Sequence, residues 1–214
     1  MAATGQHMRD DYRKRSTSRE AFPVLASKGA DGQQRIEAEP DEYWEWEKSG
    51  DPPILEKAGY LLVSMGQDVS TARLTAVASE VRYVGQGWMP VTGLDATQAK
   101  ASAVFLNSTP GRLLIMGRPG KKLAYPFYNP AAWRSLPIPD LADPHICSTL
   151  AACWEATRGE VVPQFRDGYT EVRRRWDAAV CAALDWDIDE ISGLGELLAR
   201  EPRVRGVAYG QWKA

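Results

Sequence analysis

Hydrophobic and polar residues follow two different periods along this chain, and the change of period divides it. Between residues 58 and 92, β-branched and aromatic residues form short runs separated by glycine and polar turns. This pattern is typical of β-strands, which we expect at residues 59–65, 72–84 and 87–92. The middle of the chain is therefore predicted to be rich in β-structure.

A helix is predicted directly after the last of these strands, over residues 96–107. Asp95 precedes it as an N-cap, and its small apolar residues share one face. Residues 107–111 (NSTPG) then end or sharply bend the helix. The short run 111–117 fits either a strand or one more helical turn, because periodicity does not separate the two at that length.

Further along, Asn129 and Pro130 predict a short helix through Trp133, with residues 135–139 extended after it. The last third has the period of amphipathic helices, which we expect at residues 145–157, 169–184 and 187–200. Strands followed by helices, rather than an alternation of the two, indicate an α+β fold.

The order of these elements predicts how the chain is organised. Residues 1–20 are polar and charged without an apolar period, which is typical of a mobile tail. Residues 21–140 are expected to form an α+β domain, with a β-rich core and one central helix. Residues 141–214 are expected to form a helical extension packed on that domain. An aromatic and acidic stretch at 40–48 (PDEYWEWEK) fits a short strand or an arm laid over the core.

The composition is that of a chain able to bury a core. Its 214 residues are 44% hydrophobic and include eight tryptophans, which suits one domain, alone or with a small appendage. No apolar run approaches the roughly 18 to 20 residues of a membrane span, and the start of the chain lacks the pattern of a signal peptide. We therefore expect a cytoplasmic protein without a membrane partner.

Few residues are available for metal or nucleophilic chemistry. The chain has three cysteines and two histidines. His145, Cys147 and Cys153 are close in sequence, but there is no C-x2-C pair and no fourth ligand at a usual spacing. We therefore expect cysteines that pack on helix faces and no metal site, and the odd number of cysteines argues against a disulfide framework.

Charge is distributed unevenly along the chain. The net charge is −3 over residues 1–57, +5 over 58–139 and −4 over 140–214. Within the middle part, residues 96–139 hold six basic residues and no acid: Lys100, Arg112, Arg118, Lys121, Lys122 and Arg134. Clustered Lys and Arg bind polyanions, although a solvated basic face explains the same pattern equally well.

Three motifs approach catalytic patterns without completing them. Residues 51–54 (DPPI) match the Asp-Pro-Pro-aromatic motif of amino-methyltransferases except at Ile54, which cannot stack on a flipped base, and too few residues precede them for the cofactor loop. Residues 45–48 (EWEK) place Trp46 where a magnesium nuclease needs an acid. Residues 117–122 lack the spacing and the hydroxyl group of a phosphate-binding loop. We assign no catalytic residue.

Three other motifs share their order and spacing with a known family. They are A-x-A-V-F-L-N-S-T-P-G-R at 101–112, G-R-x-G-K-K-L-x-Y-P at 117–126 and R-S-L-P-I-P at 134–139. Together they resemble the target recognition domains at the C-terminal end of adenine-specific DNA methyltransferases in restriction–modification and phage-defence systems. They are also similar to the recognition domains of type I specificity subunits. The resemblance spans roughly residues 20–205.

The resemblance implies a non-catalytic module that recognises a sequence in double-stranded DNA. The catalytic domain that such enzymes carry ahead of this region, where S-adenosylmethionine binds, is missing here. The chain then corresponds to a separate specificity polypeptide or to the C-terminal fragment of a full-length adenine-specific DNA methyltransferase. Its partner in either form is a methyltransferase catalytic subunit or domain, and no cofactor is expected on the chain itself.

The expected DNA-binding residues fall between positions 107 and 134. Basic side chains there suit phosphates, an arginine suits the edge of a guanine, and a tyrosine suits stacking on a base. The set is Asn107, Ser108, Arg112, Arg118, Lys121, Lys122, Tyr125 and Arg134. For Asn107 and Ser108 the favoured alternative is that they cap and end the helix. Residues 173–175 (RRR) fit either contact with the DNA backbone or a solvated helix face.

Two other functions stay open at the level of sequence. A protein–protein adaptor of a defence complex would use the acidic stretch 41–47 and the helical C-terminus to dock a partner. An independent methyltransferase would have to bind S-adenosylmethionine, which we do not expect of this chain.

Overall fold

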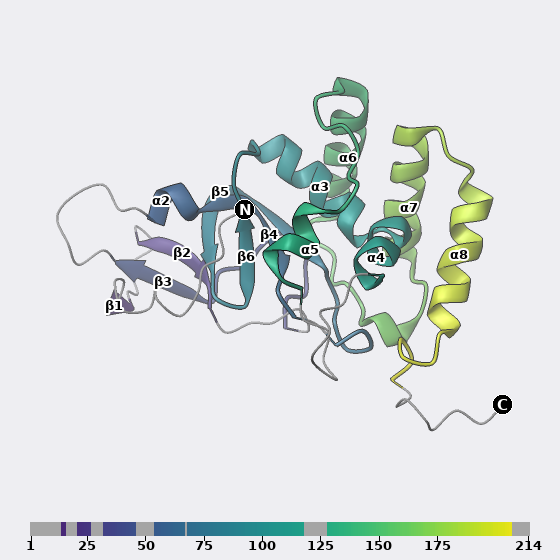
Figure 1. The fold of residues 1–214 in the computed structure, drawn as a ribbon, viewed down its shortest axis with the longest axis horizontal. Helices are drawn as coiled ribbons and strands as arrows, with labels where there is room; N and C mark the ends of the chain where they lie inside the picture. The colour runs from purple at the N-terminus through teal and green to yellow at the C-terminus, as the bar shows by residue number, and fades with distance from the viewer. Residues whose placement is uncertain are drawn as a thin grey trace.

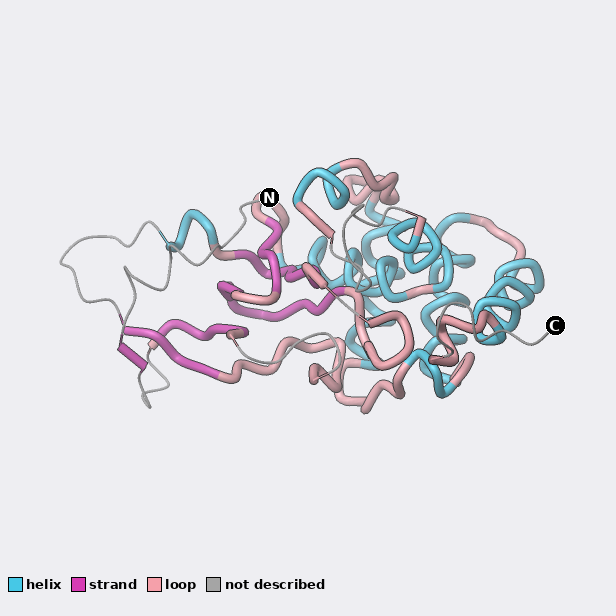
Figure 2. The backbone as a smooth tube through the Cα atoms, turned by 60° about the horizontal axis from the view of Figure 1, so that its bottom comes forward, coloured by secondary structure: helices cyan, strands magenta, loops and turns pink. Residues whose placement is uncertain are grey.

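The computed structural model describes residues 14–15, 21–26, 32–45, 54–66, 68–117 and 128–206. Strands occupy one half of the molecule and most helices occupy the other (Figure 1, Figure 2). Strands come first along the chain and the long helices come later, so the fold is α+β, as the sequence predicts.

The described strands form one mixed sheet in the order β1-β3-β2-β5-β4-β6. They are β1 (Lys14–Arg15), β2 (Phe22–Leu25), β3 (Glu42–Glu45), β4 (Gly59–Ser64), β5 (Ala76–Gly85) and β6 (Trp88–Val91). Neighbouring strands are antiparallel except β2 and β5, which run parallel with Val24 opposite Val84. The three strands predicted between residues 59 and 92 are all present.

Strands β1, β2 and β3 make up the N-terminal part of the sheet. The sequence of residues 40–48 allowed either a short strand or an arm over the core. The structure has a strand there, β3. In the predicted tail, β1 pairs with β3. Val24 and Trp44 of this part share a small second cluster of buried hydrophobic side chains with Ala58 and Val84.

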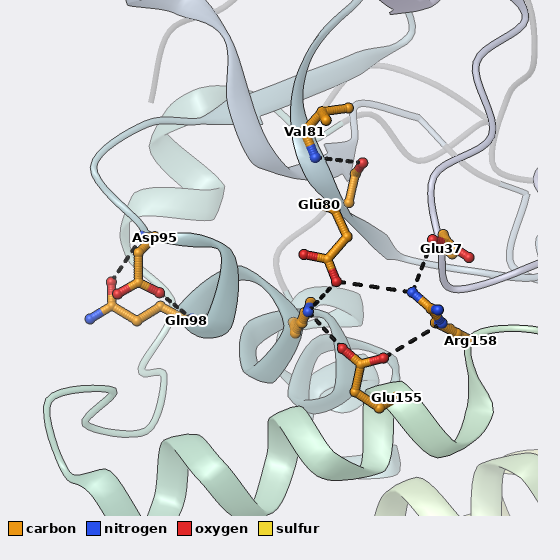
Figure 3. A network of polar contacts seen from close by, with 9 residues as sticks. Glu37, Glu80, Val81, Asp95, Gln98, Glu155 and Arg158 are labelled. Carbon is orange, nitrogen blue, oxygen red and sulfur yellow. Dashed lines mark hydrogen bonds and ion pairs between the residues drawn. The ribbon is translucent and has the colours of Figure 1, made fainter.

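Strand β5 is regular at its ends and irregular in its middle. Its register against β4 shifts, so that residues 79–82 stand opposite Tyr60 alone. Glu80, Val81 and Arg82 are exposed as a result, although the residues on either side are buried. This irregularity directs the carboxylate of Glu80 toward the helical half of the molecule (Figure 3).

Helix α3 (Ala96–Asn107) is the central helix, and it begins and ends where the sequence predicts. Asp95 accepts a hydrogen bond from the Gln98 amide at 2.8 Å, and the Gln98 side chain accepts one from the Asp95 amide at 3.2 Å (Figure 3). This capping box fixes the start of the helix. Residues 99–107 are all buried, because α3 packs between the sheet and the later helices.

Two shorter helices follow. Helix α4 (Thr109–Met116) includes the run that the sequence left open between strand and helix, and Ser108 caps it while Pro110 lies in its first turn. Helix α5 (Pro130–Arg134) begins after Asn129, whose side chain accepts a hydrogen bond from the Ala132 amide at 2.9 Å. The helix predicted through Trp133 is thus confirmed.

The remaining helices complete the core. They are the short α2 (Ile54–Lys57), α6 (Pro144–Thr157), α7 (Glu171–Leu184), α8 (Ile188–Arg200) and a 3-10 turn at Phe165–Asp167. The three long ones lie within two residues of their predicted bounds. One hydrophobic core joins the sheet, α3, α6 and α7, and it contains the fully buried Trp88, Trp154 and Trp176. None of the described helices is long and apolar enough to cross a membrane.

Candidate nucleic-acid interface

Asn107, the last residue of α3, joins that helix to the sheet. Its side chain is fully buried. The amide oxygen accepts hydrogen bonds from the backbone of Thr75 at 2.7 Å and of Ala76 at 3.4 Å. The amide nitrogen donates to the carbonyls of Ala76 at 2.7 Å and Ala103 at 2.8 Å. All of these contacts are internal, so Asn107 is a structural residue in this fold and does not face a ligand.

Ser108 connects α3 to α4. Its hydroxyl donates to the Phe105 carbonyl at 2.6 Å and accepts from the Gly111 amide at 3.4 Å, and its side chain is fully buried. One residue thereby ends the first helix and begins the second. The geometry supports helix capping for Ser108, whereas Asn107 ties the end of α3 to the sheet. Neither side chain is exposed.

Arg112 is the third predicted DNA-binding residue that the structure places in the interior. It is 6% exposed, and its guanidinium lies over the Phe165 ring, 3.5 Å from the centroid. Burial lowers the pKa of Arg112 to about 9 against the opposing effect of Asp177. Two of its nitrogens, Nε and Nη2, are buried without a hydrogen-bond partner. Arg112 is therefore part of the core and is not available to a phosphate.

Arg173 on α7 lies close to Arg112 and contacts the same aromatic ring. Its guanidinium lies 4.4 Å from the centroid of the same Phe165 ring and donates to the carbonyls of Arg73 at 3.0 Å and Pro163 at 2.8 Å. Burial, together with the charge of Arg112, holds the pKa of Arg173 well below its usual value. For residues 173–175 the sequence left open contact with the DNA backbone or a solvated helix face. Arg173 does neither in this structure, because it is buried.

Asp177 opposes the charge of both arginines. Its carboxylate is fully buried and accepts hydrogen bonds from the Thr109 amide at 2.6 Å and the Tyr169 hydroxyl at 2.7 Å. Burial raises the pKa of Asp177, although these hydrogen bonds and the nearby charge of Arg112 act to lower it. We call Arg112, Phe165, Arg173 and Asp177 the buried arginine cluster. Sequence reasoning missed this cluster, although its signal was present in an arginine and an aspartate four residues apart on the face of a helix.

The neighbours of Arg173 also make internal contacts. Arg174 donates to the Glu196 carboxylate at 2.9 Å, and Arg175 donates to Glu160 at 2.5 Å and to the Ala156 carbonyl at 3.1 Å. These pairs join α7 to α8 and α6. Arg174 and Arg175 therefore hold helices together, whereas Arg173 ties α7 to the loop residues Arg73 and Pro163.

Lys100, a further basic residue of the acid-free window, is neutralised from outside that window. Its ammonium group lies 2.5 Å from a carboxylate oxygen of Glu80 on β5 and 2.6 Å from one of Glu155 on α6. Arg158 extends the network to Glu37, as Figure 3 shows. The side chain of Lys100 is only 11% exposed. Part of the basic excess counted along the sequence is thus cancelled in space.

Arg134 is the predicted site residue that the structure places on the surface, at the end of α5. Arg118, Lys121, Lys122 and Tyr125 lie outside the described residues. The chain on both sides of them is well fixed. Gly117 ends α4, and Tyr128 is buried, donates its amide to the Met65 carbonyl at 2.8 Å and packs edge-on against Trp133. The structure therefore fixes where this basic segment leaves and rejoins the core.

Metal and thiol chemistry find little support among the described residues. No group of three or more His, Cys, Asp or Glu is placed there to hold a metal ion. Cys147, Cys153 and Cys181 are free thiols on α6 and α7, and burial raises the pKa of each. Their packing on helix faces agrees with the sequence prediction.

Comparison with protein-family models, with curated proteins and with solved structures finds no match to this chain.

Proposed function

We propose that this chain is a non-catalytic DNA-recognition module of a DNA methyltransferase system for restriction–modification or phage defence, and that it acts in the cytoplasm. One observation carries the proposal. Lys100 and Arg112 are bound into the fold, and three more basic residues of the acid-free window, Arg118, Lys121 and Lys122, follow within five positions directly after Gly117, with Arg134 exposed at the end of α5.

The motif that carries the resemblance has a structural explanation that fits this proposal. Asn107 and Ser108 build the junction between α3 and α4, and that junction sets the direction of α4. Helix α4 in turn ends at Gly117, where the basic segment begins. In such a module the junction is scaffold, and phosphate contact is left to the segment between Gly117 and Arg134.

Catalysis belongs to another polypeptide or domain under this proposal. That partner would bind S-adenosylmethionine and transfer the methyl group to adenine, while this chain would select the DNA sequence. A full-length methyltransferase that includes this chain as its C-terminal part would distribute the same roles within one protein.

Fluorescence polarization with a labelled duplex tests the proposal. We expect weak binding at low ionic strength that falls steeply with salt. Because each phosphate contact contributes about 0.9 to the slope of log K against log [salt], Lys121→Ala with Lys122→Ala should lower that slope by about 2. The expected change in affinity is the same for every duplex sequence, since phosphate contacts carry no sequence information.

A matched variant removes two exposed positive charges elsewhere. Lys57→Ala with Arg200→Ala acts at α2 and α8, which lie at opposite ends of the molecule (Figure 1), and should leave the slope unchanged. The proposal fails if the wild-type chain shows no salt-dependent affinity, or if the two double variants lose affinity equally.

A further inference from the structure

Helix α8 carries an apolar surface that no described element covers. Leu194 is 43% exposed and Leu197 is 63% exposed, and Trp186, just before the helix, is 45% exposed. These three and Ile188 make up half of the large hydrophobic residues exposed in the described part of the chain. α8 is also the outermost helix in both views (Figure 1, Figure 2). Such a concentration is typical of a contact surface.

The packing of α8 on the molecule does not need this surface. The inner face is made by Gly195 and Leu198, of which Leu198 is 7% exposed. A Cβ added at Gly195 would lie 2.7 Å from the ring of Tyr169, which precedes α7, so α8 already lies as close to that ring as it can. Leu194 and Leu197, three residues apart, lie beside the inner face and keep a large exposed fraction, 43% and 63%. A large part of each leucine side chain therefore takes no part in packing α8 onto the other described elements.

The charges around the two leucines identify what would cover them. Glu190 lies one turn before Leu194 on α8. Glu201, which caps the end of the helix, is half-buried, and its carboxylate accepts a hydrogen bond from the Val204 amide at 2.9 Å. Residues 185–201 contain six acids and one base, a net charge of −5. A second copy of this surface would bring like charges together, because a symmetric contact pairs a patch with itself.

We propose that the α8 surface, defined as Glu190, Leu194, Leu197 and Glu201, docks a basic amphipathic helix of a partner protein. Apolar side chains of that helix would cover the two leucines, and its lysines or arginines would face the acids at both ends. The inference does not rest on DNA binding, because none of the four residues that define the α8 surface belongs to the basic segment. Either can fail without the other.

The test uses two labelled synthetic helices with the same leucine face. One carries lysine on its polar face and the other carries glutamate. Fluorescence anisotropy with the whole chain should show binding of the leucine–lysine peptide and not of the leucine–glutamate peptide. Leu194→Ser with Leu197→Ser should weaken binding about tenfold or more, since truncation of central contacts dominates such interfaces. Glu190→Gln should weaken it less and should reduce its salt dependence.

A control removes two exposed apolar residues away from α8. Val81 and Val161 are each 53% exposed, and Val81→Ser with Val161→Ser should leave peptide affinity unchanged. All of these positions are exposed, so thermal melts should show folded variants. The proposal is overturned if the leucine variant binds like the wild type, or if both peptides bind equally. It is also overturned if sedimentation shows a dimer that Leu194→Ser with Leu197→Ser abolishes, because the occupant would then be a second copy.

Discussion

At the scale of single residues, the buried arginine cluster holds two positively charged groups and one negatively charged group in the interior. Arg112 and Arg173 are both buried against Phe165, and Asp177 opposes the charge of both. A buried ion pair gains little over an apolar replacement, but removing one partner leaves an uncompensated charge. The stability of the cluster should therefore depend strongly on its carboxylate.

We expect Asp177→Asn to lower the free energy of unfolding by about 3 to 5 kcal/mol, because it leaves two buried guanidinium groups without their counter-charge. Adding Arg112→Met to that variant should recover part of the loss, since one buried charge is then removed at similar volume. Urea denaturation of the two variants and the wild type measures both effects. A double variant less stable than Asp177→Asn would contradict this explanation.

At the scale of elements, the junction between α3 and α4 requires a glycine at position 111. A Cβ there would lie 2.1 Å from the Phe105 carbonyl oxygen and 2.7 Å from the Leu106 Cα, both of them backbone atoms of α3. Neither atom can move without shifting the helix. The close approach of α4 to the end of α3 therefore depends on the absence of a side chain.

Gly111→Ala should destabilise the protein by about 3 kcal/mol, since overpacking against backbone cannot be relieved by a change of rotamer. Gly117→Ala is the matched control. Its added Cβ would meet the Leu113 carbonyl oxygen at 3.5 Å, an ordinary contact, so its stability should equal or slightly exceed that of the wild type. Thermal melts followed by circular dichroism compare the two, and similar losses for both would argue against a specific clash.

The junction between α3 and α4 also shows which features of the elements could be predicted from the sequence. The starts of α3 and α5 were predictable because Asp95 and Asn129 bond to amides three residues away. The role of Asn107 was not, because its partners Thr75 and Ala76 lie more than thirty residues earlier in the chain. Strand β2 was missed for the same reason, since its parallel partner β5 lies some sixty residues further on.

At the scale of the whole molecule, charges distant in sequence meet in the network around Lys100. The acid-free window predicted a basic surface, but Glu155, fifty-five residues away, bonds to Lys100 in the folded chain. A count of charges along the sequence does not include pairs between residues that are distant in the chain. The sequence predicts a candidate region, and the fold shows that Lys100 and Arg112 are not among its exposed basic residues.

The network should show in the pH dependence of stability. Burial acts to lower the pKa of Lys100, but the hydrogen bonds that Lys100 donates to Glu155 and Glu80, together with the charges of these carboxylates, outweigh it and raise that pKa above 10.5. The stabilisation is therefore fully present below pH 10.5 and is lost as the pH rises through the higher folded-state value. Lys100→Met should cost about 1 kcal/mol at pH 7 and should flatten the fall in stability above pH 10.5.

Denaturant titrations between pH 8 and about 11.5 measure that difference. Tyr83, whose pKa burial raises to about 12, ionises in both proteins, so the comparison isolates Lys100. Equal alkaline slopes for the variant and the wild type would show that the network does not contribute.

The hydrogen bond from Arg173 to the Arg73 carbonyl has a consequence for how the protein is made. The two residues are one hundred positions apart. At about 5 to 20 residues per second, the ribosome needs roughly 5 to 20 s to add the second after the first. Until then α7 and α8 are not complete, and the side of α3 that α7 covers faces solvent. Newly made chains should therefore depend on chaperones, and messages truncated before α7 should yield insoluble products.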